Sequence, residues 1–418
     1  MRRNGDIMEN LNLNIIPVLI GADQNCYNVA RAFHEQYGIV SHAMGRYEIG
    51  ITQNTSIVEF HAVENINTDE VFMLAMDDFA KQHEGATLIA LGCTDEYAAM
   101  LIRHREELED RYIIPYIDEP LMDKLVDKAD FYEMCDKYGI KYPKTKVLSE
   151  PTAAEELTAD KLGFEYPIIL KPSSSIDYWH HPFDGMKKVY TVNSAEEAAK
   201  VTDTIYASGY TKRIVLQDRI MGNDANMRVL TAYVGKDHKV KMMCLGHVLL
   251  EEHTPKGLGN HAAIITEYNP TLTAPFRAML EDIGYRGFAN FDIKYDDRDG
   301  SLNAFEINLR QGRSNYYVTS SGFNIAKYIV EDYVLCRDIP FEEAKEPHFW
   351  HYVPKGVVYR HANSAVVKEA KKLVKAKKES SSMWYRYDVL RNPMRIFYLI
   401  EHGRRFYKKY KTYCPEQN

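Results

Sequence analysis

The strongest candidates for catalytic or metal-binding residues lie in two stretches that alternate polar and apolar side chains and are joined by a short turn. Residues 290–295 read NFDIKY and residues 305–310 read FEINLR, which predicts a β-hairpin. Side chains alternate faces along a strand, so Asp292 should share one polar face with Glu306 and Asn308 of the return strand. Two carboxylates and an amide oxygen suit a hard cation such as Mg²⁺. The spacing therefore predicts a magnesium site on this hairpin.

A hairpin with one solvated face would show the same alternation, so the pattern alone leaves two interpretations open. Facing carboxylates repel each other unless a cation lies between them, and this favours the metal interpretation. Arg310 follows Asn308 on the same face of the return strand. We expect its guanidinium to lie where negative charge develops during a reaction.

Two lysines are candidates for binding an anion. Lys171 follows the apolar strand 166–170, and a buried lysine is costly unless an anion accompanies it. Lys128 lies in a helical stretch, where a solvent-facing charge is the usual interpretation. Ser173 and Ser174 follow Lys171 and could offer hydroxyls and backbone N–H groups to a phosphate. The alternatives are a lysine that reaches solvent and an ordinary surface loop.

Other polar residues give weaker signals. Gln217 and Asp218 end the strand RIVLQD, where a backbone edge could face a nucleobase and an acid could accept ribose hydroxyls. His180 and His181 look like a metal pair, but adjacent residues on an extended chain point to opposite faces. We therefore expect these histidines in a loop that faces the substrate. Spacing picks out no Ser/His/Asp or Cys/His nucleophile.

These residues need strands and helices that bring them together. An apolar run at 15–21 is followed by Asp23, Asn25 and a helical pattern, and the same order recurs from residue 87. Apolar strands that alternate with amphipathic helices indicate an α/β domain with a parallel, doubly wound sheet. Ligands bind beyond the C-terminal ends of such strands, so Asp23 and Asn25 are candidate substrate contacts.

The rest of the chain changes character twice. A linker between Pro115 and Pro120 ends the first domain, residues 1–120, and a second unit begins near residue 142. This unit mixes antiparallel strands with helices, which is typical of an α+β arrangement. After Pro340 the pattern loosens into a basic, aromatic-rich extension, residues 341–418.

Composition excludes several classes of protein. Of the 418 residues, 45% are hydrophobic and 27% are charged, which is ordinary for a globular protein and excludes a mainly disordered chain. The six cysteines form no CxxC pair, so neither a disulfide scaffold nor a structural zinc site is indicated. The polar N-terminus lacks the apolar centre of a signal peptide, and no run approaches the roughly 20 apolar residues of a membrane span. We expect a cytoplasmic protein.

The net charge of −7 is divided unevenly. Residues 364–418 contain 14 Lys and Arg against 5 Asp and Glu, a net charge of +9, so the preceding 363 residues carry −16. An acidic body argues against general binding of nucleic acid, whereas the tail suggests a local anionic partner. Aromatic residues between the cations suit the surface of a membrane with anionic lipid. The alternative is a solvated helix packed on the body.

The order of several motifs resembles a known superfamily. The chain presents, in sequence, DKADFY, IILKP, a small-residue loop, VLQDRIMG, NFDIKYD and FEINLRQG. This set resembles the ATP-grasp superfamily of carboxylate–amine ligases over residues 121–338. The N-terminal stretch IPVLIGADQNCYNVARAFHEQYG and the whole layout resemble, more narrowly, the D-aspartate ligases of peptidoglycan synthesis. The resemblance implies an ATP-grasp domain at 121–340, with a small lobe at about 142–216 and a larger lobe at about 217–340.

The resemblance also implies cofactors and roles. ATP and Mg²⁺ would be required, with Asp292, Glu306 and Asn308 as metal ligands. Arg310 and Lys171 would be catalytic, because they would stabilise the transferred phosphoryl group. The residues expected to contact ATP are Lys128, Lys171, Ser173, Ser174, Gln217, Asp218, Ile220 and Asp224. In many relatives the phosphate-covering loop is rich in glycine, whereas residues 173–185 read SSSIDYWHHPFDG, which suggests a lid that also recognises the acceptor.

The implied reaction joins D-aspartate to the lysine side chain of a peptidoglycan precursor stem peptide. A carboxylate would attack the γ-phosphate of ATP to give an acyl-phosphate, and an amine would then displace phosphate. An ATP-grasp ligase for another acid or amine, and a non-catalytic nucleotide-binding scaffold, are the alternatives. A homodimer and a location at the inner face of the membrane are further expectations. The candidate substrate contacts are Asp23, Asn25, His180, His181 and Arg313.

Overall fold

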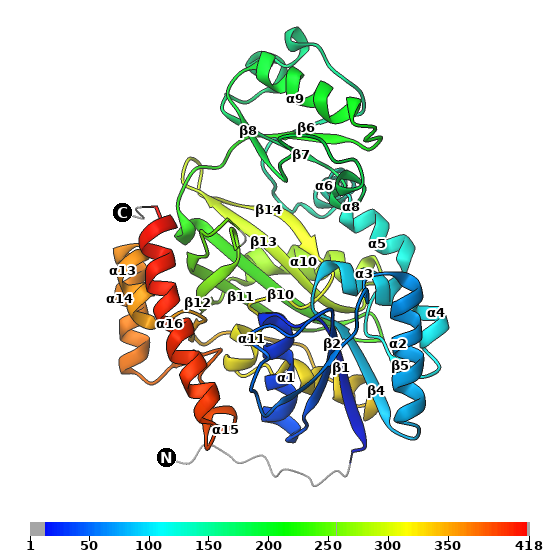
Figure 1. Cartoon of the computed structure of the whole chain (residues 1–418). Helices are drawn as coiled ribbons and strands as arrows, with labels where there is room; N and C mark the ends of the chain where they lie inside the picture. The colour runs from blue at the N-terminus through cyan, green and yellow to red at the C-terminus, as the bar shows by residue number, and fades with distance from the viewer. Residues whose placement is uncertain (1–12, 256, 416–418) are drawn as a thin grey trace.

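A parallel sheet forms the N-terminal part of the protein (Figure 1). The computed structural model describes residues 13–255 and 257–415. Five strands pair in the order β3-β2-β1-β4-β5, all parallel, which confirms the α/β arrangement expected from the alternating pattern. The elements are β1 (Ile15–Ile20), α1 (Gln24–Tyr37), β2 (Ser41–Gly45), β3 (Val58–Ala62), α2 (Asp69–Gln82), β4 (Thr87–Gly92), α3 (Asp95–Arg103), α4 (Arg105–Leu108) and β5 (Tyr112–Ile113).

Local sequence signals set the turn between β1 and α1. Asp23 has extended backbone geometry and accepts a hydrogen bond from the Cys26 N–H at 3.2 Å, as an N-cap residue does. Gly38 ends the helix in the left-handed conformation, with φ at 69°, which costs glycine little. Asp23 therefore lies just beyond the C-terminal end of β1.

The small lobe is built on its own antiparallel sheet of four strands in the order β6-β9-β7-β8. Figure 1 shows this lobe above the rest of the molecule, with α5 and α6 leading into it. The elements are α5 (Glu119–Val126), α6 (Lys128–Tyr138), β6 (Thr145–Leu148), η1 (Ala154–Glu156), α7 (Ala159–Leu162), β7 (Ile168–Pro172), α8 (Ser175–Trp179), β8 (Tyr190–Val192), α9 (Ala195–Ala207) and β9 (Ile214–Gln217).

The larger lobe contains a mixed sheet whose main path is β14-β13-β10-β11-β12-β16-β17, with β15 paired to β11. Strands β10 to β14 pair with one another in antiparallel fashion, whereas β15 is parallel to β11. The elements are η2 (Asp224–Asn226), β10 (Met227–Val234), β11 (Val240–Glu251), β12 (His261–Glu267), α10 (Pro270–Asp282), β13 (Gly287–Asp296), β14 (Ser301–Asn308), α11 (Tyr316–Ser320), α12 (Ile325–Ile329), the π-helix η3 (Val330–Val334) and β15 (Glu342–Glu343).

The C-terminal extension is folded onto the body. Strand β16 pairs with β12, and β17 pairs with β16, so the extension continues the large sheet. In its last part, the Arg395 guanidinium and the Asp388 carboxylate form a fully buried ion pair at 2.9 Å, and the Tyr27 hydroxyl donates to Asp388 at 2.7 Å. The elements are β16 (Phe349–His351), α13 (Lys355–His361), α14 (Ser364–Lys375), β17 (Glu379–Ser381), α15 (Arg386–Val389) and α16 (Pro393–Tyr413).

The buried apolar residues form two separate cores. One core is continuous through the parallel sheet, the large sheet and the C-terminal helices. The other lies inside the small lobe alone and includes Leu170, Tyr178 and Ile205. The small lobe is therefore connected to the body by few apolar contacts, and the cleft between them is the place where a ligand can bind.

Candidate active site

A cleft of about 1020 Å³ lies between the small lobe and the large sheet. Its walls come from the end of β7, the segment after β9, the hairpin β13–β14 and the segment that follows β14. The predicted residues that line it are Lys128, Lys171, Gln217, Asp218, Ile220, Asp292, Glu306, Asn308, Arg310 and Arg313. Residues from distant parts of the sequence thus meet in one place.

The hairpin places the three predicted metal ligands next to one another. Asp292 on β13 pairs directly with Glu306 on β14, as the alternation predicts. Asn308 is two residues further along, and its side-chain amide donates a hydrogen bond to the Asp292 carboxylate at 3.2 Å. A β-bulge follows Asp292 and locally shifts the register. Two carboxylates and an amide therefore face the cleft from adjacent strands.

The electrostatics of the pair fit a cation. Burial, followed by the negative charge of Glu306, raises the pKa of Asp292 to about 7. For Glu306, burial acts in the same direction, but the nearby cations Lys128, Lys188 and Lys171 outweigh it and lower the pKa. One carboxylate is thus held ionised while its neighbour is driven towards the neutral form. A divalent cation between them would relieve this repulsion, so the donor set fits Mg²⁺.

Two buried lysines approach the acids from the other side of the cleft. The Lys128 ammonium, at the start of α6, lies 3.8 Å from a Glu306 carboxylate oxygen. Lys171, on β7, donates a hydrogen bond to the Tyr132 hydroxyl at 3.1 Å. Burial lowers the pKa of both lysines, and that of Lys171 falls to about 8. A bound polyphosphate would add negative charge beside these buried ammonium groups and so stabilise their charged form.

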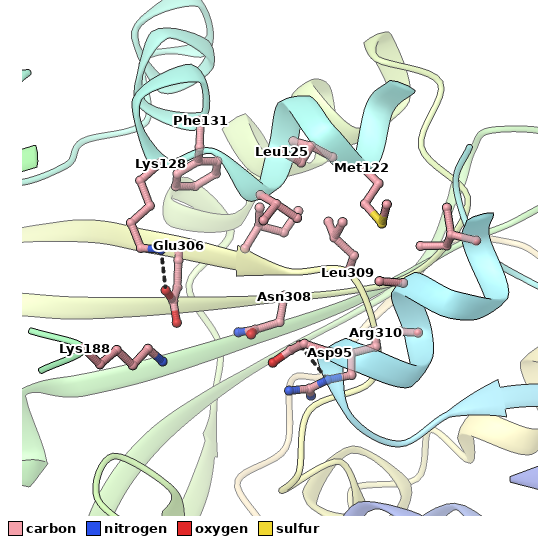
Figure 2. A pocket seen from close by; sticks show the side chains of 15 residues that line it. Asp95, Met122, Leu125, Lys128, Phe131, Lys188, Glu306, Asn308, Leu309 and Arg310 are labelled. Carbon is pink, nitrogen blue, oxygen red and sulfur yellow. Dashed lines mark ion pairs between the residues drawn. The ribbon is translucent and has the colours of Figure 1, made fainter. Parts of the chain in front are cut away.

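Arg310 is held in place by the N-terminal domain. Its guanidinium forms an ion pair with Asp95 at 2.8 Å, and Asp95 is the first residue of α3. Figure 2 shows Arg310 against Asp95 and, further along β14, Lys128 directed at Glu306. Beside these groups lies an apolar recess of about 150 Å³ between α3, α5 and β14. The arginine is therefore oriented by a domain that does not itself hold the metal ligands.

Comparison with known proteins places the chain in a family. No protein-family model matches it. It is 38% identical to the D-aspartate ligase of Enterococcus faecium (strain Aus0004) over 388 residues, which cover 90% of this chain and 92% of that one. The chain belongs to the D-aspartate ligase family. It is accordingly an ATP-dependent ligase that forms an amide bond.

Solved structures agree on the fold of the ligase. The N5-carboxyaminoimidazole synthetase of Staphylococcus aureus, in complex with ADP, is 15% identical with a TM-score of 0.56, and 87% of each chain is covered. The biotin carboxylase domain of Hydrogenobacter thermophilus 2-oxoglutarate carboxylase, in complex with magnesium ADP, is 16% identical with a TM-score of 0.54, covering 76% of this chain and 69% of that one. These likenesses confirm the expected ATP-grasp fold.

The residues that the sequence predicts to contact adenine and ribose differ in the contacts they make. Gln217 is buried, and its side-chain amide donates to the Thr145 hydroxyl at 2.9 Å. The Asp218 carboxylate forms an ion pair with Arg298 at 2.8 Å. Ile220 is a buried apolar part of the wall. Gln217 and Ile220 therefore shape the cleft, whereas the Asp218 carboxylate is already paired.

Asp224 and the two serines do not line the cleft. The Asp224 carboxylate accepts hydrogen bonds from the Glu251 N–H at 2.8 Å and from His253 at 2.9 Å, behind the cleft wall. The Ser173 hydroxyl donates to Asp127 at 2.7 Å, and the Ser174 hydroxyl accepts from the Asp177 N–H as the N-cap of α8. These side chains stabilise the framework around the cleft.

The predicted lid is placed differently from the expectation. Among the side chains that the structure describes at 173–174 and 177–185, none lines the cleft; Lys187, Lys188 and Val189 do, from the segment just before β8. His180 is exposed, and His181 packs near Gly209 at the edge of the small lobe. The sequence signal for Lys187 and Lys188 was their position just before a short strand. The serine-rich loop gave a stronger signal for phosphate binding, so this position was not recognised.

The remaining candidate substrate residues, Asn25 and Arg313, differ in their access to the cleft. The Asn25 amide is fully buried and donates to the Cys93 and Gln311 carbonyls at 2.9 and 3.0 Å, so it fastens the domain to the segment after β14. Arg313 lines the cleft, with its guanidinium 4.0 Å from Asp23 and 3.5 Å from Glu252. Arg313 is thus the substrate candidate with direct access to the cleft.

One cluster elsewhere contains metal-binding residue types. His42, Glu59 and His61 come together on β2 and β3, with 2.9 Å between the two imidazole nitrogens. A direct hydrogen bond between the imidazoles accounts for that distance. The short distance between the two imidazoles therefore needs no metal ion to explain it.

Proposed function

We propose that the ligase joins D-aspartate, through an acyl-phosphate, to the lysine side-chain amine of a peptidoglycan precursor stem peptide. The observation that carries the choice of amino acid is the 38% identity to a D-aspartate ligase along 90% of the chain. The cleft supports the chemistry, because Asp292, Glu306 and Asn308 face Lys128 and Lys171 across it.

Each group has a role in carboxylate activation. Asp292, Glu306 and Asn308 would hold Mg²⁺, which neutralises phosphate charge when it is bound. The two buried lysines would bind the phosphates of ATP. Phosphoryl transfer needs little covalent help from a protein, so charge neutralisation and alignment supply most of the catalysis.

The product of that first step must be protected from water. Arg310, oriented by Asp95 at 2.8 Å, would donate to the transferred phosphoryl oxygens and to the acyl-phosphate. Closure of the small lobe would exclude water while the amine attacks the acyl carbon and phosphate leaves. The small lobe has its own core, so it can close as a unit.

Arg313 is the proposed contact for the side-chain carboxylate of aspartate. Three other arginines, Arg31, Arg213 and Arg228, do not line the cleft and are engaged by carbonyls or acids. Arg313 lines the cleft, with its guanidinium 3.5 Å from Glu252. A second carboxylate in the substrate gives Arg313 a charged partner, which distinguishes aspartate from amino acids with neutral side chains.

The test is Mg²⁺-dependent release of phosphate from ATP with a panel of D- and L-amino acids. Each amino acid is assayed with and without a precursor whose stem peptide contains lysine, and the product is identified by mass. Release that requires D-aspartate and the precursor together supports the proposal. Release with another acid or amine contradicts the substrate assignment and retains the ligase chemistry.

Two variants sharpen this assay. Glu306→Gln should abolish turnover, because it removes a carboxylate from the metal site. Asp299→Asn alters an exposed acid on the turn of the same hairpin and should leave turnover unchanged. ATP binding with no release for any pair of substrates would favour a nucleotide-binding scaffold instead. A homodimer is a separate proposal, checked by light scattering.

A further inference from the structure

The last helix of the protein presents two different faces. Arg395, Leu399, Phe406 and Tyr410 of α16 are buried against the body. At 3.6 residues per turn, Met394, Phe397 and Ile400 lie on the opposite side of the helix. Their side chains are 61%, 65% and 43% exposed. These three residues, an apolar row along α16, are not part of the core, because other residues of α16 face the body.

Large exposed apolar residues also precede the row. Tyr387, within α15, is 64% exposed, and Leu390, directly after this helix, is 58% exposed. Figure 1 shows α16 along the outside of the molecule, beside α13 and α14. Single exposed apolar residues are common on soluble proteins, but a group of five on one short segment marks a contact surface.

The charges around the apolar row are mostly positive. Between residues 384 and 413, each charged side chain classed as exposed is a cation: Arg386, Arg391, Arg404, Arg405, Lys408, Lys409 and Lys411. Asp388 is buried in its ion pair with Arg395, and Glu401 is partly buried and paired with Arg404 at 2.8 Å. On the outward side of α16, Arg404, Lys408 and Lys411 continue the line that Met394, Phe397 and Ile400 begin.

We propose that the outward face of α16 docks on the surface of a bilayer that contains anionic lipid. Met394, Phe397 and Ile400 would enter the boundary between headgroups and acyl chains, and the cations would lie among the anionic headgroups. An amphipathic helix with apolar residues on one side and cations beside them binds such an interface in its plane. Charge complementarity selects the partner, because the exposed charges of this segment are cations and its one partly exposed acid, Glu401, is paired with Arg404.

Other occupants fit this face less well. Pairing of two identical copies through a twofold axis would bring the cations of both copies together. Among residues 13–255 and 257–415, no helix has the length and apolar character needed to cross a bilayer. The protein would therefore rest on the surface, and the contact would be reversible and sensitive to salt.

The experiment is flotation of the full-length protein with vesicles. One set is phosphatidylcholine alone, and the other contains one third phosphatidylglycerol. We expect the protein to float with the anionic vesicles and to be released at high salt. Phe397→Ser with Met394→Ser should weaken binding by about tenfold or more, and Lys408→Glu with Lys411→Glu should do the same.

Matched controls separate the docking face from general effects. Leu74→Ser changes a residue on α2 that is 58% exposed, and Lys81→Glu reverses an exposed charge on the same helix. Neither should change flotation. Circular dichroism of every variant checks that α16 remains folded. Ligase turnover with soluble substrates should be unaffected by the α16 variants.

Three outcomes would overturn the proposal. They are absence of the wild type from anionic vesicles, equal flotation with pure phosphatidylcholine, and a Phe397→Ser variant that floats normally but loses self-association in light scattering. The last outcome would assign the face to a contact between two copies of the chain. Flotation requires no turnover, so a wrong substrate assignment would leave this result intact.

Discussion

The hairpin β13–β14 and the small lobe supply charged groups to the same cleft, but the protein holds them differently. The hairpin lies in the large sheet and belongs to the continuous core of the body. The small lobe carries Lys171 on a four-stranded sheet with a separate core. The proposed metal ligands are thus fixed, whereas the small lobe, the proposed cover over the phosphates, can move relative to them.

This difference suits a ligase with a hydrolysable intermediate. In their proposed role as metal ligands, Asp292 and Glu306 must keep a fixed spacing, because Mg²⁺ accepts little deviation from its octahedral geometry. The phosphate cover must open to admit ATP and close to exclude water. Substitutions in the body should therefore act on the chemical step, and substitutions in the small lobe should act on binding and closure.

Arg310 should give the largest effect on the body side. Arg310→Met should lower kcat by about 10³-fold with little change in the KM for ATP, because the guanidinium would act mainly on developing charge. The measurement is steady-state phosphate release. Asp95→Asn keeps the arginine but weakens the ion pair that orients it, so it should lower kcat by a smaller factor, again with little change in the KM for ATP. A large rise in KM with unchanged kcat would contradict this division of roles.

Lys171 should give the largest effect in the small lobe. Lys171→Met should raise the dissociation constant of ATP by about 10²-fold, because a buried ammonium that faces the phosphates is replaced by an apolar group. Lys200→Met, on the exposed surface of α9, is the matched control in the same lobe. Titration calorimetry measures both. Unchanged ATP affinity in Lys171→Met would remove this lysine from the phosphate site.

The pH dependence of ATP binding tests the same lysine without changing its structure. Burial lowers the pKa of Lys171 to about 8 in the free protein. Below about pH 8 the Lys171 side chain is a charged ammonium that can bind phosphate. Above about pH 8 it is mostly neutral, so it must take up a proton when ATP binds, and this weakens binding. The dissociation constant for ATP should therefore rise by up to about tenfold between pH 7 and pH 9. The Lys171→Met variant should lack this component, and an equal rise in the variant would assign it to another group.

The comparison also shows how far the sequence could predict the site. In the hairpin, alternation of side chains is a local property, so the pairing of Asp292 with Glu306 could be predicted from the strands alone. The ion pair between Asp95 and Arg310 joins two domains that are far apart in sequence. No local pattern encodes such a contact, because it depends on how two separately patterned units pack.

The small lobe and the tail show the same limit. The sequence suggested the serine-rich loop as the phosphate cover. In the structure, Tyr178 of α8 is buried in the core of the small lobe. Lys187 and Lys188, which follow that loop, line the cleft instead. In the tail, composition predicted a basic surface. It did not predict that β16 and β17 extend the large sheet, since strands of three residues carry too little periodicity.

The smallest expected effect tests whether the small lobe unfolds by itself. Ile205→Val removes one methyl group from its core and should lower the local stability of the lobe by about 1 kcal/mol. Ile329→Val makes the same change in the core of the body, where Ile329 is also fully buried. Amide hydrogen exchange should show faster exchange confined to the small lobe for the first variant only. If both variants accelerated exchange throughout the chain, the two cores would unfold as one unit, and the division between a fixed site and a movable cover would fail.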